Sequence, residues 1–282
     1  MIRYATAAEV EAALGRAMTC AEATWFQYSA TMPDYWLWWH TALVFLVFYT
    51  LTPLPLALLE HLAPAVALKY KLQPRVRLSP AALFRCYRDS ARLVLIVMSP
   101  CLIVFYPIVK VMGIIRTGLP LPSIWEIAPQ LVVYHFVEDY LSYWIHRLLH
   151  TKWAYNSIHH VHHEFRAPAG FAASHSHWAE VLILAIPTFV GPAVVPCHVT
   201  THLLWFSVRV MEAAETHCGY DFPFSPAKLI PFYGGAEYHD YHHYVGGHGQ
   251  SNFSSIFTYC DFIYRTNKGY SHHKAGITKR NR

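Results

Sequence analysis

The sequence predicts an all-α integral membrane protein with about four transmembrane or hairpin helices and a histidine-rich helical cap on the cytosolic side. Of its 282 residues, 54% are hydrophobic and 14% are charged, whereas about 25% charged residues are usual in a soluble domain. Several stretches approach or exceed the roughly 20 apolar residues that a helix needs to cross a bilayer. No repeat, low-complexity run or long polar linker divides the chain, so we expect one membrane-embedded domain over residues 1–282.

An amphipathic segment is expected at residues 1–33, before the first apolar stretch. This segment lacks the apolar core of a secretory signal peptide. Thr6 and Glu9 have the spacing of a capping box, which predicts a helix at roughly residues 7–19.

Four apolar stretches are expected to form the membrane helices: residues 35–59, 93–109, 127–145 and 181–208. Pro53 and Pro55 interrupt the first stretch, and Glu138 and Asp139 are the charged residues of the third. The fourth has no charged residue but contains three prolines, which predict two short helices in a bent hairpin.

Basic residues gather in two places. Seven lie within residues 69–92, where Asp89 is the only acidic residue, and six lie in the last segment: Lys69, Lys71, Arg75, Arg77, Arg85, Arg88 and Arg92, then Arg265, Lys268, Lys274, Lys279, Arg280 and Arg282. The positive-inside rule places both groups in the cytosol. Nucleic-acid binding also uses basic runs, but it does not suit a chain this apolar. The six cysteines have no CxxC spacing, which argues against a disulfide framework or a thiolate metal site.

Three histidine clusters lie within residues 130–265, the expected histidine-box region. HRLLH places His146 and His150 at i and i+4, on one face of a helix. HHVHH and HDYHH share the spacing H-x-x-H-H, which on a helix brings three histidines together: His159, His162 and His163, then His239, His242 and His243. His160 points about 100° away from its neighbours by the helical period.

The three clusters together indicate a metal centre. Neutral imidazole binds zinc, copper, iron and nickel, and one such pair alone is weak evidence. Eight imidazoles exceed the four ligands of zinc or the six of an octahedral ion, so two ions are expected. Two competing motifs fail: HEFRA has Ala167 where a zinc protease needs its second histidine, and the Glu-x-x-His pair of soluble di-iron bundles is missing at the boxes.

The boxes resemble the fatty acid hydroxylase and sterol desaturase superfamily, which is defined by HxxxH, HxxHH and HxxHH. Four segments resemble the C4-methylsterol monooxygenases within it: EDYLSYWIHRLLH (138–150), IHHVHHEFRAPAGFAASHSHWAE (158–180), ETHCGYDFPFSP (215–226) and IPFYGGAEYHDYHHYVGGHGQSNFSSIFTYCDFIY (230–264). GGAEYHDYHHYVGG and QSNF look like the plant type that acts on 4,4-dimethyl sterols. The N-terminal half matches only in its apolar pattern.

This resemblance implies two non-haem iron ions, O2 as co-substrate, and electrons from NAD(P)H through cytochrome b5 and its reductase. It also implies oxidation of one C4 methyl group of a sterol through alcohol and aldehyde to carboxylate, in a sterol C4-demethylation complex. A methyl C–H bond offers no acid, base or leaving group, so its hydroxylation needs a redox metal, which zinc is not. The C-terminal KRNR resembles a retrieval signal for the endoplasmic reticulum membrane.

The resemblance adds His177 in SHSHWAE and His217 in ETHCGYD to the expected metal ligands. His160 departs from the family, where a basic residue is usual, and is left out. His135 is expected to be structural. Four further histidines match no family position and are expected to be solvated: His175, His248, His272 and His273.

Asp139 is the main carboxylate expected to act in the site. It lies seven residues before His146 on the same helical face, and ligating histidines usually donate their other N–H to a carboxylate or carbonyl. The alternative is that Asp139 and Glu138 pair with basic residues near the membrane interface. Asp240 and Asp261 are weaker candidates of the same kind.

Two other functions stay open at this point. A C5 sterol desaturase, a fatty acid hydroxylase or an aldehyde decarbonylase would use the same metal centre. A non-catalytic membrane scaffold would hold zinc at the same histidines, and ligand type alone does not separate zinc from iron.

Overall fold

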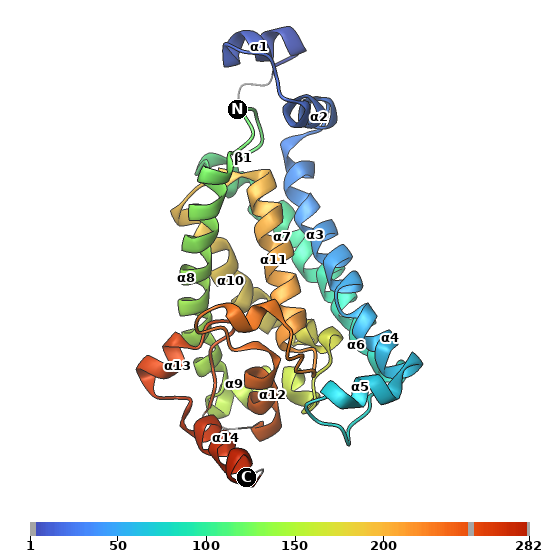
Figure 1. Ribbon diagram of the computed structural model, residues 1–282. Coiled ribbons are helices and arrows are strands. Elements are labelled where there is room, and N and C mark those ends of the chain that lie inside the picture. The colour runs from blue at the N-terminus through green and yellow to red at the C-terminus, as the bar shows by residue number, and fades with distance from the viewer. Residues whose placement is uncertain (1–3, 248–250, 281–282) are drawn as a thin grey trace.

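The computed structural model describes residues 4–247 and 251–280, and these residues are mostly helical (Figure 1). The α-helices of the described chain are α1 (Ala7–Leu14), α2 (Cys20–Ser29), α3 (Asp34–Leu51), α4 (Leu54–Leu62), α5 (Pro64–Tyr70), α6 (Pro80–Leu93), α7 (Ser99–Val111), α8 (Ile124–Leu149), α9 (Lys152–Ser157), α10 (Trp178–Val194), α11 (Val199–Thr216), α12 (Gly235–Val245), α13 (Tyr259–Tyr264) and α14 (Lys268–Arg280). Shorter elements are the π-helical turn η1 (Val94–Met98), the 3-10 helices η2 (His159–Glu164), η3 (Gly170–Ser174) and η4 (Pro226–Leu229), and the strands β1 (Ile115–Arg116) and β2 (Cys197–His198).

The long helices form a bundle with a cap at one end (Figure 1). α3, α7, α8, α10 and α11 run side by side, and α1 and α2 lie at the end away from the cap. The cap consists of α9, α12, α13 and α14 with the loops between them. α5, where the first basic group begins, also lies at the cap end, as does α14, which carries Lys268 and Lys274 of the second group.

The N-terminal segment contains two short helices where the sequence predicts one over residues 7–19. Thr6 does cap α1, because its side chain accepts from the Glu9 backbone N–H. The reciprocal contact of a capping box is missing there, because the Glu9 side chain accepts from Ala5 N instead. The helix ends at Leu14, because the next residue, Gly15, adopts a left-handed conformation with φ 66°. A complete capping box between Thr19 and Glu22 then starts α2.

Two segments of the described chain are long and apolar enough to cross a membrane: Asp34–Leu62 and Pro80–Val111. The predicted break in the first is confirmed, because α3 ends at Leu51 and α4 begins beyond Pro53. The second changes to a π-helical turn just before Pro100, whose ring displaces the regular hydrogen bond of the preceding turn. The expected number of four spans stays a prediction, since α8 carries internal charges and α10 has only 17 residues.

The predicted hairpin in the last apolar stretch is confirmed by α10 and α11. Pro196 lies in the turn between the two helices, while Pro187 and Pro192 are accommodated inside α10. The Trp205 indole N–H donates to the Thr188 carbonyl at 3.0 Å and links the two arms. β1 pairs in parallel with β2 and ties this turn to the end of α7.

α8 packs closely against α10 at Gly191. A Cβ atom at this glycine would lie 2.9 Å from Tyr134 Cδ1 and 3.0 Å from Tyr134 Cα, so only glycine allows the observed approach. The Tyr134 hydroxyl donates to the Val195 carbonyl at 2.7 Å. This contact fixes α8, which carries the first histidine box, against the hairpin.

Candidate metal centre

Nine buried histidines form two groups in the cap and at the adjoining helix ends. Within each group one nitrogen atom per residue lies within 4.8 Å of all the others. The first group is His146, His150, His159, His163 and His242, and the second is His162, His217, His239 and His243. All eight box histidines and His217 are therefore brought together.

Each H-x-x-H-H box supplies both groups. In η2, His159 and His163 belong to the first group and His162 to the second. In α12 the assignment is reversed, since the i, i+4 pair of His239 and His243 joins the second group and His242 joins the first. The expectation that each box converges on one point is therefore wrong: the i, i+4 pair and the third histidine face different groups.

Helix ends position most of these side chains. His146 lies in the last turn of α8 with His150 as its C-cap, and His217 is the C-cap of α11. The HHVHH segment forms a 3-10 helix rather than the α-helix that its spacing suggests. The exposed side chain in this segment is His160, as its helical phase predicts.

Carbonyl groups hold the Nδ1 side of six of the nine imidazoles. The Nδ1–acceptor distances are 2.8 Å for His146 to Phe253 O, 3.1 Å for His150 to Gly247 O, 3.2 Å for His162 to His175 O, 2.8 Å for His217 to Ala213 O, 2.8 Å for His242 to Ser251 O and 3.1 Å for His243 to Phe165 O. A carbonyl oxygen only accepts, so Nδ1 carries the proton in each of these rings. Their Nε2 atoms therefore present lone pairs.

These lone pairs face one another across short distances. Nε2 of His150 lies 3.1 Å from Nε2 of His242, and Nε2 of His162 lies 3.2 Å from Nε2 of His217. Neither nitrogen of such a pair has a proton to donate, so the contact is not a hydrogen bond. A cation that accepts both lone pairs makes the arrangement favourable, and the donor set of each group therefore fits a metal ion.

Glu180 is a site residue that the sequence does not single out. Its Oε1 accepts from His159 Nδ1 at 2.8 Å, and both side chains are 1% exposed. A carboxylate behind a ligating imidazole fixes its tautomer and raises its basicity. Glu180 lies in the first turn of α10, just before the uncharged stretch, and this isolated buried charge is the signal that could have identified it.

Burial favours the neutral form of the imidazoles in the two histidine groups. Burial, and then the charge of neighbouring imidazoles, holds the pKa of five of them well below the usual value: His159, His162, His239, His242 and His243. Neutral imidazole is the form that binds a metal.

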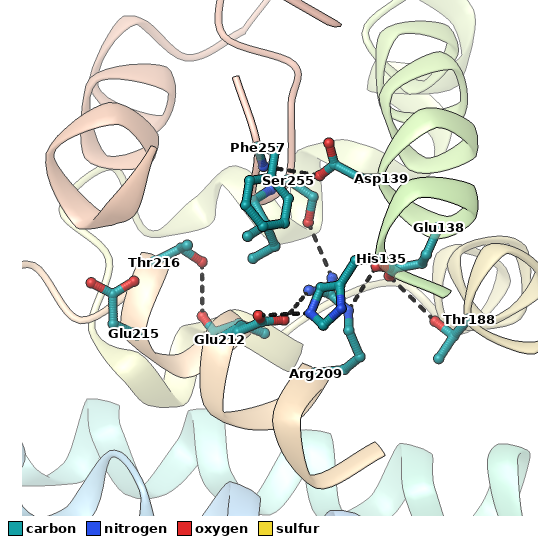
Figure 2. A network of polar contacts seen from close by, with 12 residues as sticks. His135, Glu138, Asp139, Thr188, Arg209, Glu212, Glu215, Thr216, Ser255 and Phe257 are labelled. Atoms are coloured by element: carbon teal, nitrogen blue, oxygen red, sulfur yellow. Dashed lines mark hydrogen bonds and ion pairs between the residues drawn. The ribbon is translucent and has the colours of Figure 1, made fainter. Parts of the chain in front are cut away.

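Asp139 does not hold His146 as the sequence suggests. Its Oδ1 accepts from the backbone N–H groups of Ile256 and Phe257, each at 3.1 Å (Figure 2). Seven residues span roughly 10 Å along a helix, which is too far for a direct bond to His146. Asp261 fixes the start of the same loop by accepting from Phe253 N at 2.9 Å. Both aspartates therefore position the loop whose Phe253 carbonyl accepts a hydrogen bond from His146 Nδ1.

The other histidines lie outside both groups. His177 is the N-cap of α10, where its Nδ1 accepts from Ala179 N at 3.3 Å. The expectation that His175 is solvated is wrong: its ring packs against Phe165, its Nε2 lies 3.2 Å from Glu164 Oε2, and the side chain is buried. His135 has the structural role expected of it, with Nε2 3.0 Å from Glu212 Oε1. Two are exposed as expected, His272 and His273; His248 and part of the KRNR signal lie outside the described residues.

Two cavities of about 630 Å³ flank the bundle, a size typical of small-molecule sites. One lies among α3, α7 and α10, and apart from His202 its lining is apolar. The other lies between α4, α11 and α12 and mixes apolar side chains with Glu215, Asp221, Glu237 and Lys274. The apolar cavity is the one that suits a lipid.

Comparison with known proteins places the chain in one family. Residues 131–266 match the fatty acid hydroxylase family model. A very-long-chain aldehyde decarbonylase of Oryza sativa subsp. japonica is 64% identical over 98% of this chain and 91% of its own length. Methylsterol monooxygenases 1-1 and 1-2 of Arabidopsis thaliana are 55% and 54% identical, each over 97% of this chain and 92% of their own length. No solved structure gives a significant match. The two histidine groups and this similarity over nearly the whole chain lead to one conclusion: the chain belongs to the fatty acid hydroxylase family.

Proposed function

We propose that this protein is a methylsterol monooxygenase that oxidises a C4 methyl group of 4,4-dimethyl sterols at a non-haem di-iron centre. The observation that carries this proposal is the pair of buried imidazole groups with facing Nε2 lone pairs. They occur in a chain 55% and 54% identical to two methylsterol monooxygenases.

The nine histidines would hold the two ions, five around one and four around the other. Iron, when bound there, would supply the reductive activation of O2 that breaking a methyl C–H bond requires. Redox-silent zinc fits the same ligands but not this chemistry. Each of the three oxidations, from methyl to alcohol, aldehyde and carboxylate, uses two electrons, and cytochrome b5 with its NAD(P)H-dependent reductase is the donor we propose.

The protein's own groups keep the centre ordered and dry. The carbonyl acceptors and Glu180 fix the tautomer and orientation of seven imidazoles. Burial of all nine excludes water, which strengthens electrostatic interactions at the site and limits side reactions.

The membrane location is also proposed. Many large apolar side chains of α6, η1 and α7 are more than half exposed: Phe84, Leu95, Ile96, Ile103, Val104, Phe105, Ile108 and Val111. A soluble protein rarely leaves such a continuous apolar surface in water, whereas lipid would cover it. With basic residues at the cap end, the positive-inside rule favours a multi-pass protein of the endoplasmic reticulum whose histidine boxes face the cytosol.

Aldehyde decarbonylation is a second candidate, because the rice relative of that name is 64% identical. A long-chain aldehyde would bring its carbonyl carbon to the same ions. We favour the sterol because the chain is also 53% identical to a third methylsterol monooxygenase of Arabidopsis thaliana over 97% of its length.

Product analysis separates the two activities. Membranes containing the protein, cytochrome b5, its reductase and NADPH are supplied with either a 4,4-dimethyl sterol or a C28 aldehyde. The proposal predicts O2-dependent 4-hydroxymethyl and 4-carboxy sterols in the first case and no alkane in the second. Alkane formation without any sterol product would assign the decarbonylase activity instead. A His242→Ala variant, which lacks a proposed ligand, is the inactive control in both cases.

A further inference from the structure

A smaller cavity adjoins the apolar cavity and lies close to the residues that hold the second histidine group. It has a volume of about 210 Å³ and lies among η1, α8, α10 and α11. It shares four lining residues with the large apolar cavity: Met98, Val181, Ala185 and Phe189. The two cavities therefore form one path, apolar at its outer end.

The inner end of this path adjoins the second histidine group. Ala213 lines the small cavity, and its carbonyl oxygen accepts a hydrogen bond from His217 Nδ1. Ser174 lines the cavity as well. It precedes His175, whose carbonyl oxygen accepts a hydrogen bond from His162 Nδ1. This group would hold its ion with four imidazoles, whereas the first group has five.

A buried ion pair forms part of the wall. Arg209 Nε lies 2.7 Å from Glu138 Oε2, and Arg209 also pairs with Glu212 at 2.5 Å (Figure 2). The side chains of Glu138 and Arg209 are 6% and 10% exposed. Both line the cavity, whereas Glu212 does not.

Glu138 has acceptor capacity left for a ligand. Its Oε2 faces Arg209, and among the residues that the structure describes Oε1 has only a long contact of 3.5 Å from the Thr188 hydroxyl. A carboxylate offers about four lone-pair positions, so Oε1 can accept another hydrogen bond.

We propose that Glu138, held by Arg209, receives the 3-hydroxyl group of the sterol and thereby aims a C4 methyl group at the second histidine group. This inference rests on the proposed function, because it takes a 3-hydroxy-4-methyl sterol as the ligand. The hydroxyl of such a sterol is on the carbon next to the one that bears the reacting methyl, so its partner must lie near the metal centre. The rest of the sterol is apolar and fits the outer cavity.

The spacing along two helices agrees with this placement. Arg209, which holds Glu138, lies eight residues before His217 of the second group, and Glu138 itself lies eight residues before His146 of the adjacent first group. Eight residues correspond to roughly 12 Å along a helix. That length accommodates the hydrogen bond, the carbon that carries the hydroxyl, the methyl group and a metal–ligand bond.

The test compares a 4,4-dimethyl sterol with its 3-deoxy analogue. Binding of each radiolabelled sterol is measured on the full-length protein in detergent, and turnover is measured with cytochrome b5 and its reductase. The variants are Glu138→Gln and, as a matched control, Glu212→Gln, which also alters a carboxylate beside Arg209 but one outside the cavity. Thermal unfolding and metal content report whether each variant is folded.

We expect the wild type to favour the 3-hydroxy sterol by roughly 10- to 100-fold, the range for a buried hydrogen bond to a charged group. Glu138→Gln should reduce this preference about tenfold through weaker binding of the hydroxy sterol, while Glu212→Gln leaves it unchanged. Equal binding of both sterols by the wild type, or an equal loss in both variants, would overturn the inference. If both sterols are oxidised equally, the proposed function stands and the inference about Glu138 fails. If hydroxyl-dependent binding is lost in Glu138→Gln but no sterol is oxidised, the inference stands and the proposed function fails.

Discussion

Replacing Glu180 with alanine removes the carboxylate behind His159. The contact is 2.8 Å long and both side chains are 1% exposed, so water does not replace the lost acceptor. A buried donor left unpaired costs about 1–3 kcal/mol. Loss of such a partner typically lowers metal affinity by roughly 10- to 100-fold, which corresponds to about 1.4–2.8 kcal/mol. The two estimates agree, so we expect Glu180→Ala to lose most of one metal ion per chain.

The assay is metal content after dialysis against a graded series of chelator concentrations, together with thermal unfolding in detergent. Glu180→Gln should retain more metal than Glu180→Ala, because its amide oxygen still accepts from His159. Glu212→Gln is the control, since Glu212 pairs with His135, which is outside both groups. Wild-type metal retention in Glu180→Ala would refute the role assigned to this carboxylate.

Three further outcomes are expected. His242→Ala and His217→Ala should each lose the ion of their own group, so metal analysis of either variant should give about one ion per chain; loss of neither ion would count against the grouping. His177→Ala should keep both ions by the same analysis, because this side chain caps α10; a lost ion would restore it as a ligand. Gly191→Ala should destabilise the protein by about 1–3 kcal/mol through its contact with Tyr134, seen as a lower unfolding temperature; an unchanged temperature would show that α8 and α10 can separate there.

The sequence carries enough information to predict the site in outline. Histidines at i and i+4 share a helix face, and eight imidazoles are too many for one ion, so two ions follow from the spacing alone. The proline positions in the last apolar stretch likewise predict its bent hairpin, which α10 and α11 form.

Two features depend on tertiary structure and could not be predicted. The helical period does not reveal that the third histidine of each H-x-x-H-H box, His162 or His242, lies in a different group from the i, i+4 pair of the same box. The acceptors behind the rings are mostly backbone carbonyls such as Phe253 O, more than 100 residues from His146 in sequence, and a carbonyl carries no residue signature. The helical phase of Asp139 predicts a contact with His146, but its Oδ1 accepts hydrogen bonds from the loop that folds against α8 instead.

The secondary structure of η2 could not be predicted from the sequence either. The isolated HHVHH pattern fits an α-helix, but the segment forms a 3-10 helix within the cap. Histidines of η2 contact His150 and His217 at the ends of α8 and α11, and His243 of α12. We attribute the local geometry to these tertiary contacts.

Metal counting on the intact protein tests the account most directly. The full-length chain is purified in detergent under anaerobic conditions, and its iron and zinc are measured per chain alongside its Mössbauer spectrum. Nine imidazoles in two adjacent groups predict two iron ions per chain in nitrogen-rich sites. A protein that is active on 4,4-dimethyl sterols with one ion per chain, or with zinc alone, would contradict the di-iron centre proposed here.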